Sequence, residues 1–417
     1  MTEIGEMPQG WRVVRLGDAS LNITDGSHFS PKETKNGNYR IGTVANMTEN
    51  QIDIDSCKKI SKEDYEMLVK NGCKPKIGDV LFSKDGTVGL SFAFKQNDDI
   101  VLLSSIAIIS PKESLYPDYC ACVLKSPLVF KQIEGSKRGT GLKRIILHDL
   151  KRFQIPLPPL PEQRRIAEVL GTVDSAIQKV GGAIESTERL KKGLMQRLLT
   201  GGIGHERFKE SEVGRVPEEW EVVKLNDVCQ QIIDCPHSTP KFVDNGPLVV
   251  RNFNIRDGRF SLHESYYTTE EEYIDRIKRC IPSEGDILFS REAPIGEACL
   301  VPPRLRLCLG QRTMLIRTIP TILFAQFQVY SFYSNLVRPR LFRKGGGATA
   351  HHLNVAEVKK LEIPLPPLPE QRRIAEILSV VDRKLELERR RKEKLERVKK
   401  GLMNELLTGR KRVKNNF

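Results

Sequence analysis

The sequence IPLPPLPEQRRIAE occupies Ile155–Glu168, and the same fourteen letters return without a change at Ile363–Glu376. Each copy runs on to a Gly-Leu-Met and a Leu-Leu-Thr-Gly sequence, at 193–201 and again at 401–409. The offset is 208 residues at both ends, because 363 minus 155 and 401 minus 193 give the same number. Loops accept insertions easily, whereas packed helices must keep their register. The chain is therefore a tandem duplication with a rigid helical segment in each half.

Prolines mark the start of each helical segment. Pro156 and the prolines after it cannot lie inside a helix or a central strand, whereas Pro161 suits the first helical turn. Glu162 then favours the positive end of the helix dipole. We expect an extended lead-in followed by a helix over 162–199, with Gly181-Gly182 as the point where that helix would kink or break.

Apolar residues recur along this segment at alternating steps of four and three. In the first copy they are Ile166, Leu170, Val173, Ile177, Val180 and Ile184; in the second they are Ile374, Leu378, Val381 and Leu385. This spacing predicts a coiled-coil seam. An ordinary core helix is the alternative, but the 38 residues of 162–199 would reach roughly 57 Å, well beyond the usual helix of a globular domain.

Composition narrows the partner and the compartment. A formal net charge of +14 over 417 residues favours a polyanionic partner. No run approaches the ~20 apolar residues of a membrane-spanning helix, and no signal peptide opens the chain, so we expect a cytoplasmic protein that binds nucleic acid. The nine cysteines are odd in number and form no Cys-x-x-Cys pair, which fits neither a zinc ribbon nor a disulfide framework.

Other segments repeat with the helices. A tryptophan opening recurs at 8–16 and 217–225, and a turn, a buried strand and a basic residue recur at 78–84 and 285–291. Strand-like runs alternate with helical stretches such as 62–70. Each half therefore predicts a mixed α/β globular domain of about 150 residues.

A basic, glycine-rich loop precedes each proline segment, with the sequences KRGTGLKR at 137–144 and RKGGGATAHH at 343–352. Glycine lets the backbone approach a phosphate closely, and the flanking cations neutralise it. A nucleotide-binding loop is excluded because neither copy has the Gly-Lys-Ser/Thr ending of a Walker loop. A solvated surface loop is the open alternative.

The order of the segments predicts the architecture. The first helix leaves domain one and ends at domain two, and the second must return if it pairs with the first. We therefore expect two antiparallel coiled-coil helices, a domain at each end and a pseudo-twofold internal repeat. Because successive turns of B-DNA on one face lie about 34 Å apart, such a pair of domains suits two half-sites separated by a spacer.

Taken together, these segments resemble the specificity subunit of type I restriction-modification enzymes. The likeness covers nearly the whole chain and rests on the duplicated Pro-Leu-Pro-Pro-Leu-Pro-Glu-Gln-Arg-Arg-Ile-Ala segment, the Gly-Asp-Val/Ile-Leu-Phe-Ser strands, the Trp-Arg/Glu-Val-Val openings and the Leu-Leu-Thr-Gly endings. It implies a first target recognition domain at 1–154, a proline lead-in and long helix at 155–204, a second recognition domain at 205–362, a second lead-in and helix at 363–410 and a basic tail at 411–417.

The resemblance also implies a division of labour. Each recognition domain would read one half of an asymmetric, interrupted DNA site, the helices would set the spacer, and the chain would have no catalysis of its own. Modification subunits, two of them, would methylate adenine with S-adenosylmethionine, and restriction subunits would use ATP and magnesium. The sequence agrees, because it has no Asn/Asp-Pro-Pro-Tyr/Phe methyltransferase tetrapeptide and no Walker loop. A fused enzyme and a coiled-coil scaffold without DNA affinity are the rival hypotheses.

Comparing the two halves sorts the candidate site residues. Positions shared by both halves cannot explain two different half-sites, so they hold the fold or contact phosphate, whereas positions that differ read bases. The phosphate candidates are Lys84, Arg291, Lys137, Arg138, Arg343 and Lys344. The base-reading candidates are polar residues of the same loops, namely Lys143, Arg144, Arg251, Asn252, Asn254, Arg256, Gln311, Arg312 and His351. For the matched His28 and His237, packing inside the fold and contact with DNA are both open.

Overall fold

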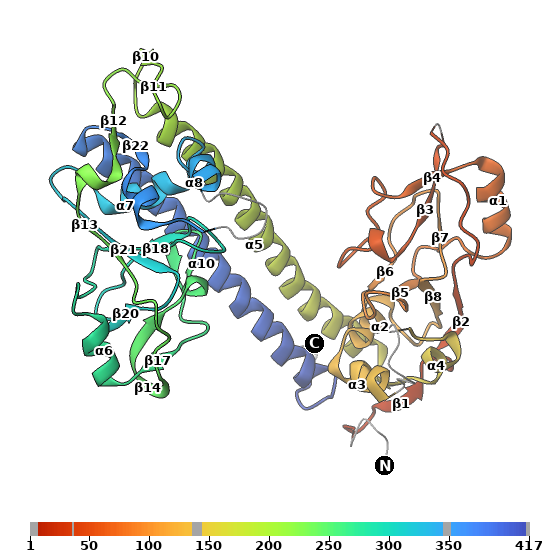
Figure 1. Cartoon of the computed structure of the whole chain (residues 1–417). Coiled ribbons are helices and arrows are strands. Elements are labelled where there is room, and N and C mark those ends of the chain that lie inside the picture. The colour runs from red at the N-terminus through yellow and green to blue at the C-terminus, as the bar shows by residue number, and fades with distance from the viewer. Residues whose placement is uncertain (1–6, 36, 136–143, 345–351, 414–417) are drawn as a thin grey trace. The chain divides into compact units, whose positions relative to one another are not determined.

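The computed structural model describes residues 7–35, 37–135, 144–344 and 352–413, and the chain divides into two compact units. Unit 1 comprises Met1–Gly181 with Arg390–Phe417, and unit 2 comprises Gly182–Arg389. Each unit contains a globular part, called head 1 or head 2 below, and a portion of both long helices (Figure 1). These helices are α5 (Leu160–Gly201) and α10 (Leu368–Leu406).

Head 1 is built on two small sheets. The first has four strands in the order β2-β8-β5-β6, with every neighbouring pair antiparallel. The second has three strands in the order β4-β3-β7, in which β3 and β7 run parallel. The strands are β2 (Ser20–Asp25), β3 (Tyr39–Gly42), β4 (Lys58–Ile60), β5 (Val80–Ser83), β6 (Ser91–Ala93), β7 (Ile100–Leu102) and β8 (Ile106–Pro111).

Head 2 repeats this topology. Its sheets have the orders β13-β21-β18-β19 and β17-β14-β20, and β14 again runs parallel to β20. The strands are β13 (Cys229–Asp234), β14 (Phe242–Val250), β17 (Tyr267–Thr268), β18 (Ile287–Ser290), β19 (Ala298–Leu300), β20 (Leu307–Leu309) and β21 (Thr313–Thr318). Two further hairpins, β10 (Phe208–Lys209) with β11 (Val216–Pro217) and β15 (Ile255–Arg256) with β16 (Arg259–Phe260), complete this part. The prediction of two mixed α/β domains is confirmed.

Short helices cover the sheets. In head 1 they are α1 (Lys62–Lys70), α2 (Pro117–Leu124), α3 (Pro127–Gly135) and α4 (Leu147–Arg152). In head 2 they are α6 (Glu270–Arg276), α7 (Ala325–Phe332), α8 (Arg338–Lys344) and α9 (Val355–Lys359). Helix α1 has the predicted bounds because Ser61 accepts a hydrogen bond from Asp64 N and acidic residues occupy its first turn.

The proline segments form edge strands, as expected of an extended lead-in. In unit 1, β9 (Gln154–Leu157) pairs antiparallel with β1 (Arg12–Arg15), with Pro156 opposite Val13. In unit 2, β22 (Glu362–Leu365) pairs with β12 (Glu221–Lys224) in the same register. Both ladders have two strands, so a proline can face the open side without breaking a hydrogen bond.

The first turn of α5 locks that helix to head 1. Trp11 Nε1 donates to Glu162 Oε2 at 3.0 Å. The Gln163 amide is fully buried; its oxygen accepts from Tyr116 N at 2.8 Å, and its nitrogen donates to the carbonyls of Ser114 and Pro158 at 2.8 and 2.9 Å. The glutamate of the repeated sequence therefore satisfies the indole N–H, and the glutamine satisfies three backbone groups that burial would otherwise leave without partners.

The first turn of α10 repeats these bonds in unit 2. Trp220 Nε1 donates to Glu370 Oε2 at 3.0 Å. Gln371 Oε1 accepts from Phe324 N at 2.8 Å, and Gln371 Nε2 donates to the carbonyls of Ile322 and Pro366 at 2.9 and 2.8 Å. The repeated fourteen residues are thus a joint between a head and the helix that leaves it.

Both long helices contribute to the core of each unit. Core 1 joins the inner face of the four-stranded sheet and α2 to Ile166 and Leu170 of α5 and to Leu406 near the end of α10. Core 2 joins the equivalent sheet and α7 to Leu199 of α5 and Ile374 of α10. Full burial of one such side chain stabilises by about 1.5–3 kcal/mol.

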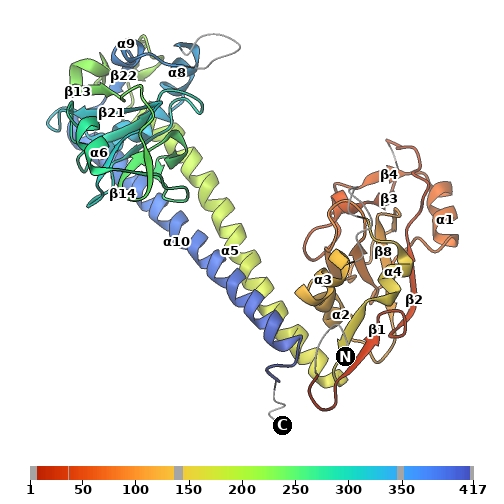
Figure 2. The same cartoon turned by 60° about the horizontal axis from the view of Figure 1, so that its bottom comes forward.

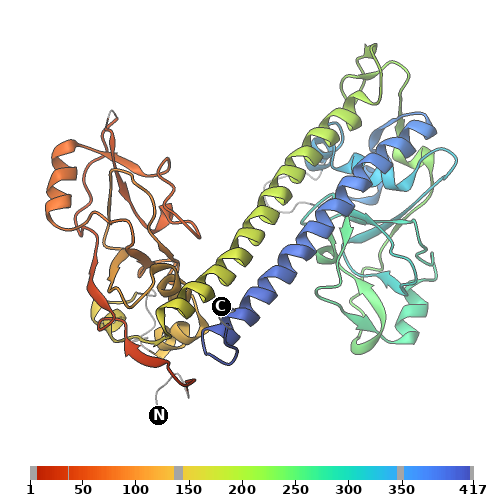
Figure 3. The ribbon, with the colours of Figure 1, turned by 180° about the vertical axis from the view of Figure 1, so that it is seen from behind.

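Helix α5 continues without interruption through Gly181-Gly182, so the expected kink or break is absent. Each glycine costs only about 1 kcal/mol relative to alanine, and the packed segments on both sides exceed that cost. Between the two cores, Ile177 and Ile184 are half-buried. In unit 2, Arg389 Nη2 lies 2.6 Å from Glu188 Oε1 where the two helices run side by side (Figure 2, Figure 3).

Candidate nucleic-acid interface

One edge of the four-stranded sheet in head 1 gathers charged side chains. The ends of β2 and β5 meet the start of β8 there, because both strands pair antiparallel with β8. Lys84 Nζ, which follows β5, lies 3.3 Å from Asp25 Oδ2 and 3.0 Å from Asp85 Oδ2, and its side chain is 2% exposed. The lysine therefore fastens two loop ends together below the surface.

The same edge of head 2 has an arginine in place of the lysine. Arg291 Nε lies 3.2 Å from Asp234 Oδ1, and its Nη1 and Nη2 lie 3.2 Å from His352 Nε2 and 3.5 Å from His237 Nδ1. The Arg291 side chain is 7% exposed. This cluster again joins the end of β13, at Asp234, to the segment that follows β18, at Arg291.

These surroundings correct the interpretation of Lys84 and Arg291 as phosphate ligands. Each is buried with its charge already matched by a carboxylate, so a phosphate would have to break that pair and pay its desolvation cost. The hypothesis that His28 and His237 pack inside the fold is also wrong, because their side chains are 69% and 72% exposed. Each histidine stands beside the aspartate of its own cluster.

Exposed arginines lie above both clusters. Arg144 is 57% exposed, with Nε 3.1 Å from Asp85 Oδ1, and Arg312 is 56% exposed, with Nε 2.9 Å from Glu292 Oε2. Arg312 has a φ of 72°, a left-handed conformation that costs a non-glycine residue about 1–2 kcal/mol. Strain of this kind concentrates at functional sites.

Several candidates of the glycine-rich loops cannot be placed. Lys137, Arg138, Lys143 and His351 lie outside the described residues, as does the side chain of Lys344. Arg343 is exposed near the end of α8. These residues stay predictions.

A cleft in head 2 brings four predicted base-reading residues together. They are Arg251, Asn252, Gln311 and Arg312, and the other lining residues are Thr239, Pro240, Phe242, Val249 and Gly310. Asn252 Nδ2 donates to Ala293 O at 2.6 Å, and Gln311 Nε2 donates to His237 O at 2.9 Å. Among the described residues, no hydrogen bond uses the side-chain oxygen of either amide, so both oxygens can accept from a ligand.

Aromatic rings hold Arg251 at this cleft, a feature that the sequence comparison missed. Its guanidinium carbon lies 5.1 Å from the ring centroid of Phe253 and 5.0 Å from that of Tyr266, which are cation–π distances. Phe242 packs against Tyr266 with ring centroids 5.0 Å apart. In the sequence, the only sign of this arrangement was a phenylalanine two residues after Arg251.

Two other candidates lie elsewhere. Asn254 is 1% exposed; its Oδ1 accepts from Arg251 N, and its Nδ2 donates to Ser261 O and Glu264 O, each at 2.9 Å. Its amide is therefore used up in closing a turn, which corrects the base-reading interpretation of Asn254. Arg256 is exposed on β15 and does not line the cleft.

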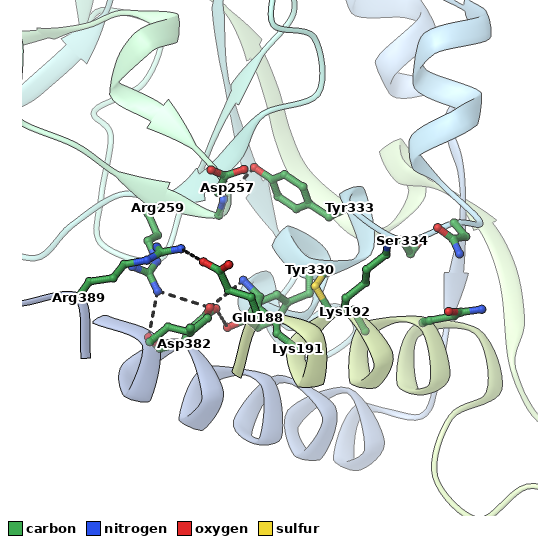
Figure 4. Close-up of a pocket in the computed structure, with 15 residues that line it drawn as sticks. Glu188, Lys191, Lys192, Asp257, Arg259, Tyr330, Tyr333, Ser334, Asp382 and Arg389 are labelled. Carbon is green, nitrogen blue, oxygen red and sulfur yellow. Dashed lines mark hydrogen bonds and ion pairs between the residues drawn. The ribbon is translucent and has the colours of Figure 1, made fainter. Parts of the chain in front are cut away.

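A larger cleft of unit 2 lies where head 2 meets the long helices (Figure 4). Several of its charges pair with one another: Lys191 Nζ lies 2.7 Å and Arg259 Nη2 lies 3.6 Å from Asp382 Oδ1, and Arg389 Nη2 lies 2.6 Å from Glu188 Oε1. Tyr330 donates to Asp382 at 2.8 Å, and burial raises the pKa of Tyr330. The ion pairs and the hydrogen bond from Tyr330 in this cleft connect head 2 to α5 and α10.

Asp118 and Asp149 are acidic residues that could belong to a nuclease-like carboxylate set, but they have separate partners. Asp118 Oδ1 lies 2.8 Å from Lys95 Nζ, and Asp149 Oδ1 lies 3.3 Å from His148 Nδ1. Within the ranges that the structure describes, no three His, Cys, Asp or Glu side chains gather closely enough to hold a metal ion. No described helix is long and apolar enough to cross a membrane.

Comparison with known proteins identifies the repeated architecture. A sequence model of the type I restriction modification DNA specificity domain matches twice, over residues 8–186 and 217–397. The chain belongs to the type I restriction-modification DNA specificity family. The two matches coincide with the two heads and their helices, so the duplication read from the sequence is a duplication of the specificity domain.

Curated relatives match this specificity subunit over its full length. The MjaX type I restriction enzyme specificity subunit of Methanocaldococcus jannaschii is 32% identical, and the alignment covers 99% of this chain and 96% of that protein. The MjaVIII specificity subunit of the same organism is 29% identical over 98% and 95% of the two chains. The resemblance inferred from the repeated motifs is confirmed.

Solved structures agree on the fold. The S subunit of a type I restriction-modification system from M. genitalium aligns over 98% of this chain and 99% of its own, with a TM-score of 0.62 at 13% identity. A chain from a type I R-M system studied for complex assembly and conformational transition aligns over 97% and 99%, with a TM-score of 0.54 at 22% identity.

Proposed function

We propose that this specificity subunit reads a bipartite, asymmetric DNA site, one half with each head, and that α5 and α10 set the spacer between the halves. One observation carries the proposal: the two heads share strand order and register but present different side chains at the same loops. A shared scaffold gives both heads the same approach to a duplex. Different loop side chains give each head a different sequence preference.

The long helices support the spacer role. Lys399 Nζ lies 2.6 Å from Asp174 Oδ1 in unit 1, and Lys191 Nζ lies 2.7 Å from Asp382 Oδ1 in unit 2. Both lysines and both aspartates are related by the repeat, because 399 minus 191 and 382 minus 174 each give 208. An antiparallel coiled coil with a pseudo-twofold axis requires each pair to recur in this way. Helices of 42 and 39 residues each reach roughly 60 Å along their own axes.

The chemistry would belong to partner subunits. We propose that two modification subunits holding S-adenosylmethionine methylate adenine in each half-site, and that restriction subunits with ATP and magnesium complete the enzyme in the cytoplasm. This chain would supply recognition without catalysis or a cofactor of its own. Support comes from the family to which the chain belongs and from its net charge of +14, which suits a DNA partner.

A genome-wide map of N6-methyladenine tests the proposal. Cells with the gene should show one interrupted, asymmetric motif that vanishes when the gene is deleted. Exchange of residues 7–154 for those of a homologous subunit should change one half of the motif and leave the other half intact. An expressed gene whose deletion changes no motif would overturn the proposal.

The spacer role has its own test. The Lys399–Asp174 pairing places Gly181 opposite the middle of the basic run 389–400. Four residues inserted after Gly181 and four more after Arg391 should lengthen the helix pair by about 6 Å, which is roughly two base pairs of B-DNA. We expect the same half-sites with a longer spacer. An unchanged spacer would show that the helices do not set it.

A further inference from the structure

A short turn recurs at the same place in both heads. It follows the central strand of the three-stranded sheet, β3 in head 1 and β14 in head 2, and forms the 3-10 helices η1 (Val44–Asn46) and η3 (Asn252–Asn254). The two turns are related by the repeat, because 254 minus 46 gives 208. The equivalent pairing of β3 with β7 and of β14 with β20 supports this correspondence, although the sequences of the two turns differ.

An asparagine closes each turn in the same way. Thr43 N donates to Asn46 Oδ1 at 2.9 Å, and Arg251 N donates to Asn254 Oδ1 at 2.9 Å. The first residues have similar backbone angles, with φ and ψ of −125° and 175° at Thr43 and −118° and 163° at Arg251. The backbone of the turn is therefore fixed independently of the side chains that it presents.

The presented side chains differ completely. Head 1 shows Thr43-Val44-Ala45, and head 2 shows Arg251-Asn252-Phe253. In head 1 the threonine hydroxyl stays within the turn, where Ala45 N donates to it at 3.2 Å. Val44 packs against the core of the head, and the exposed residue of the turn is Ala45. In head 2 the same backbone presents a cation, an amide and an aromatic ring.

We propose that this turn determines specificity in both heads, and that Arg251 reads a guanine in the half-site of head 2. The inference rests on the proposed function. The Arg251 guanidinium lies against Phe253 and Tyr266, and in the described part of the chain it makes no ion pair. Arg312, in the same cleft, is paired with Glu292. Arg251 is thus held in position with its charge not neutralised.

Guanine suits this arrangement for a geometric reason. Its O6 and N7 are neighbouring acceptors in the major groove, and the two parallel N–H groups of a guanidinium match them. The adjacent Asn252 donates its amide hydrogen to Ala293 O, which leaves its oxygen to accept from the amino group of a cytosine or an adenine. At the mouth of the same cleft, Arg251 therefore supplies hydrogen-bond donors and Asn252 supplies an acceptor.

The test uses the full chain with its modification subunits and a methylation readout on a plasmid library of half-site variants. The wild-type motif should contain a guanine in the half assigned to head 2 by domain exchange. Arg251→Ala should reduce discrimination at that one position by about tenfold to hundredfold and leave every other position unchanged. A motif without guanine in that half would overturn the inference while the proposed function stands.

Three further variants separate base reading from phosphate contact and from misfolding. Arg251→Lys keeps the charge but loses the planar fork, so it should weaken guanine selectivity; an equal loss of binding on all duplexes would show a phosphate contact instead. Arg279→Ala removes an exposed arginine outside the cleft and should leave the motif unchanged. The graft R251T, N252V and F253A keeps Asn254, so the turn should still close, and the half-site of head 2 should change at the guanine and at the base that Asn252 reads, and nowhere else. An unaltered motif from the graft would also overturn the inference.

Discussion

Heads 1 and 2 share their strand order, their register and the bonds that join each head to its helix, yet their loops differ at the sheet edge and at the turn after the central strand. Gln163 and Gln371 make the same three hydrogen bonds in the two units. Thr43 and Arg251 begin the same turn with unrelated side chains. The difference teaches that repetition in this chain marks residues with structural roles. Under the proposed function, divergence on an unchanged backbone marks the residues that would meet the target.

The joints differ in one respect. Glu162 also pairs with Arg412, whose Nη2 lies 2.7 Å from Glu162 Oε2, and this ion pair raises the pKa of Arg412. Glu370 instead contacts His205, with Nε2 3.0 Å from Glu370 Oε1. In both units the third partner comes from the segment that follows the arriving helix, so each joint clamps the end of one helix to the start of the other.

The largest effect should come from the shared joint. Gln163→Ala and Gln371→Ala each leave one buried N–H and two carbonyls without partners, which should lower the free energy of unfolding of the affected unit by about 3 kcal/mol. Hydrogen exchange measured by mass spectrometry in increasing urea resolves the two units. Arg165→Ala, on the exposed face of α5, is the control and should change little. Unequal losses in the two units would break the equivalence of the joints.

The interhelical aspartates should differ in importance. Asp382 accepts from Tyr330 and pairs with Lys191, whereas the repeat places Cys122 where unit 2 has Tyr330, so Asp174 lacks that phenol. Asp382→Ala should destabilise unit 2 by about 2–3 kcal/mol, and Asp174→Ala should destabilise unit 1 by about 1 kcal/mol. Urea unfolding of the two variants checks the order. Equal losses would show that the extra hydrogen bond contributes nothing.

The docking of one hairpin is special to unit 2. Arg259, on β16, donates to Glu386 at 2.7 Å and to Asp382 O at 2.9 Å on α10. Arg259→Ala should destabilise unit 2 by about 1 kcal/mol and increase exchange at 255–260, while unit 1 keeps its protection. Arg256→Ala on the same hairpin provides the matched control. Faster exchange in unit 1 would contradict the assignment.

The smallest effect concerns the reactivity of the cysteine thiols, because the cysteines of the two units differ in burial. Unit 1 has only buried cysteines, whereas Cys229 and Cys280 of unit 2 are half-buried. Burial raises the pKa of Cys280, and it raises that of Cys229 to about 12, so both thiols are protonated at neutral pH and the thiolate fraction rises with pH. Alkylation followed by mass spectrometry should label Cys280 first and faster with increasing pH. Labelling of Cys120 in the folded protein would contradict the packing of head 1.

Sequence patterns among neighbouring residues correctly predicted the elements that neighbouring residues stabilise. The cap at Ser61 and the acidic first turn placed α1 correctly, and the seam of apolar residues together with an unbroken offset of 208 placed the long helices. Propensity misjudged Gly181-Gly182, because the cost of two glycines is small beside the packing of the helix on both sides. Comparing the halves also misassigned Lys84 and Asn254, whose polar types are equally suited to binding DNA and to satisfying buried groups.

By itself, the sequence determined the duplication, the family and the helices that link two mixed α/β heads, since periodicity, capping and repeat spacing act over neighbouring residues. Only the tertiary structure decided which charges are available. The charge of Lys84 is neutralised by Asp25, which lies far from it in the sequence. The guanidinium of Arg251 packs against the ring of Tyr266, which belongs to a separate segment of the chain. Burial and pairing depend on residues that the fold brings together from distant positions, and no spacing along the chain records those distances.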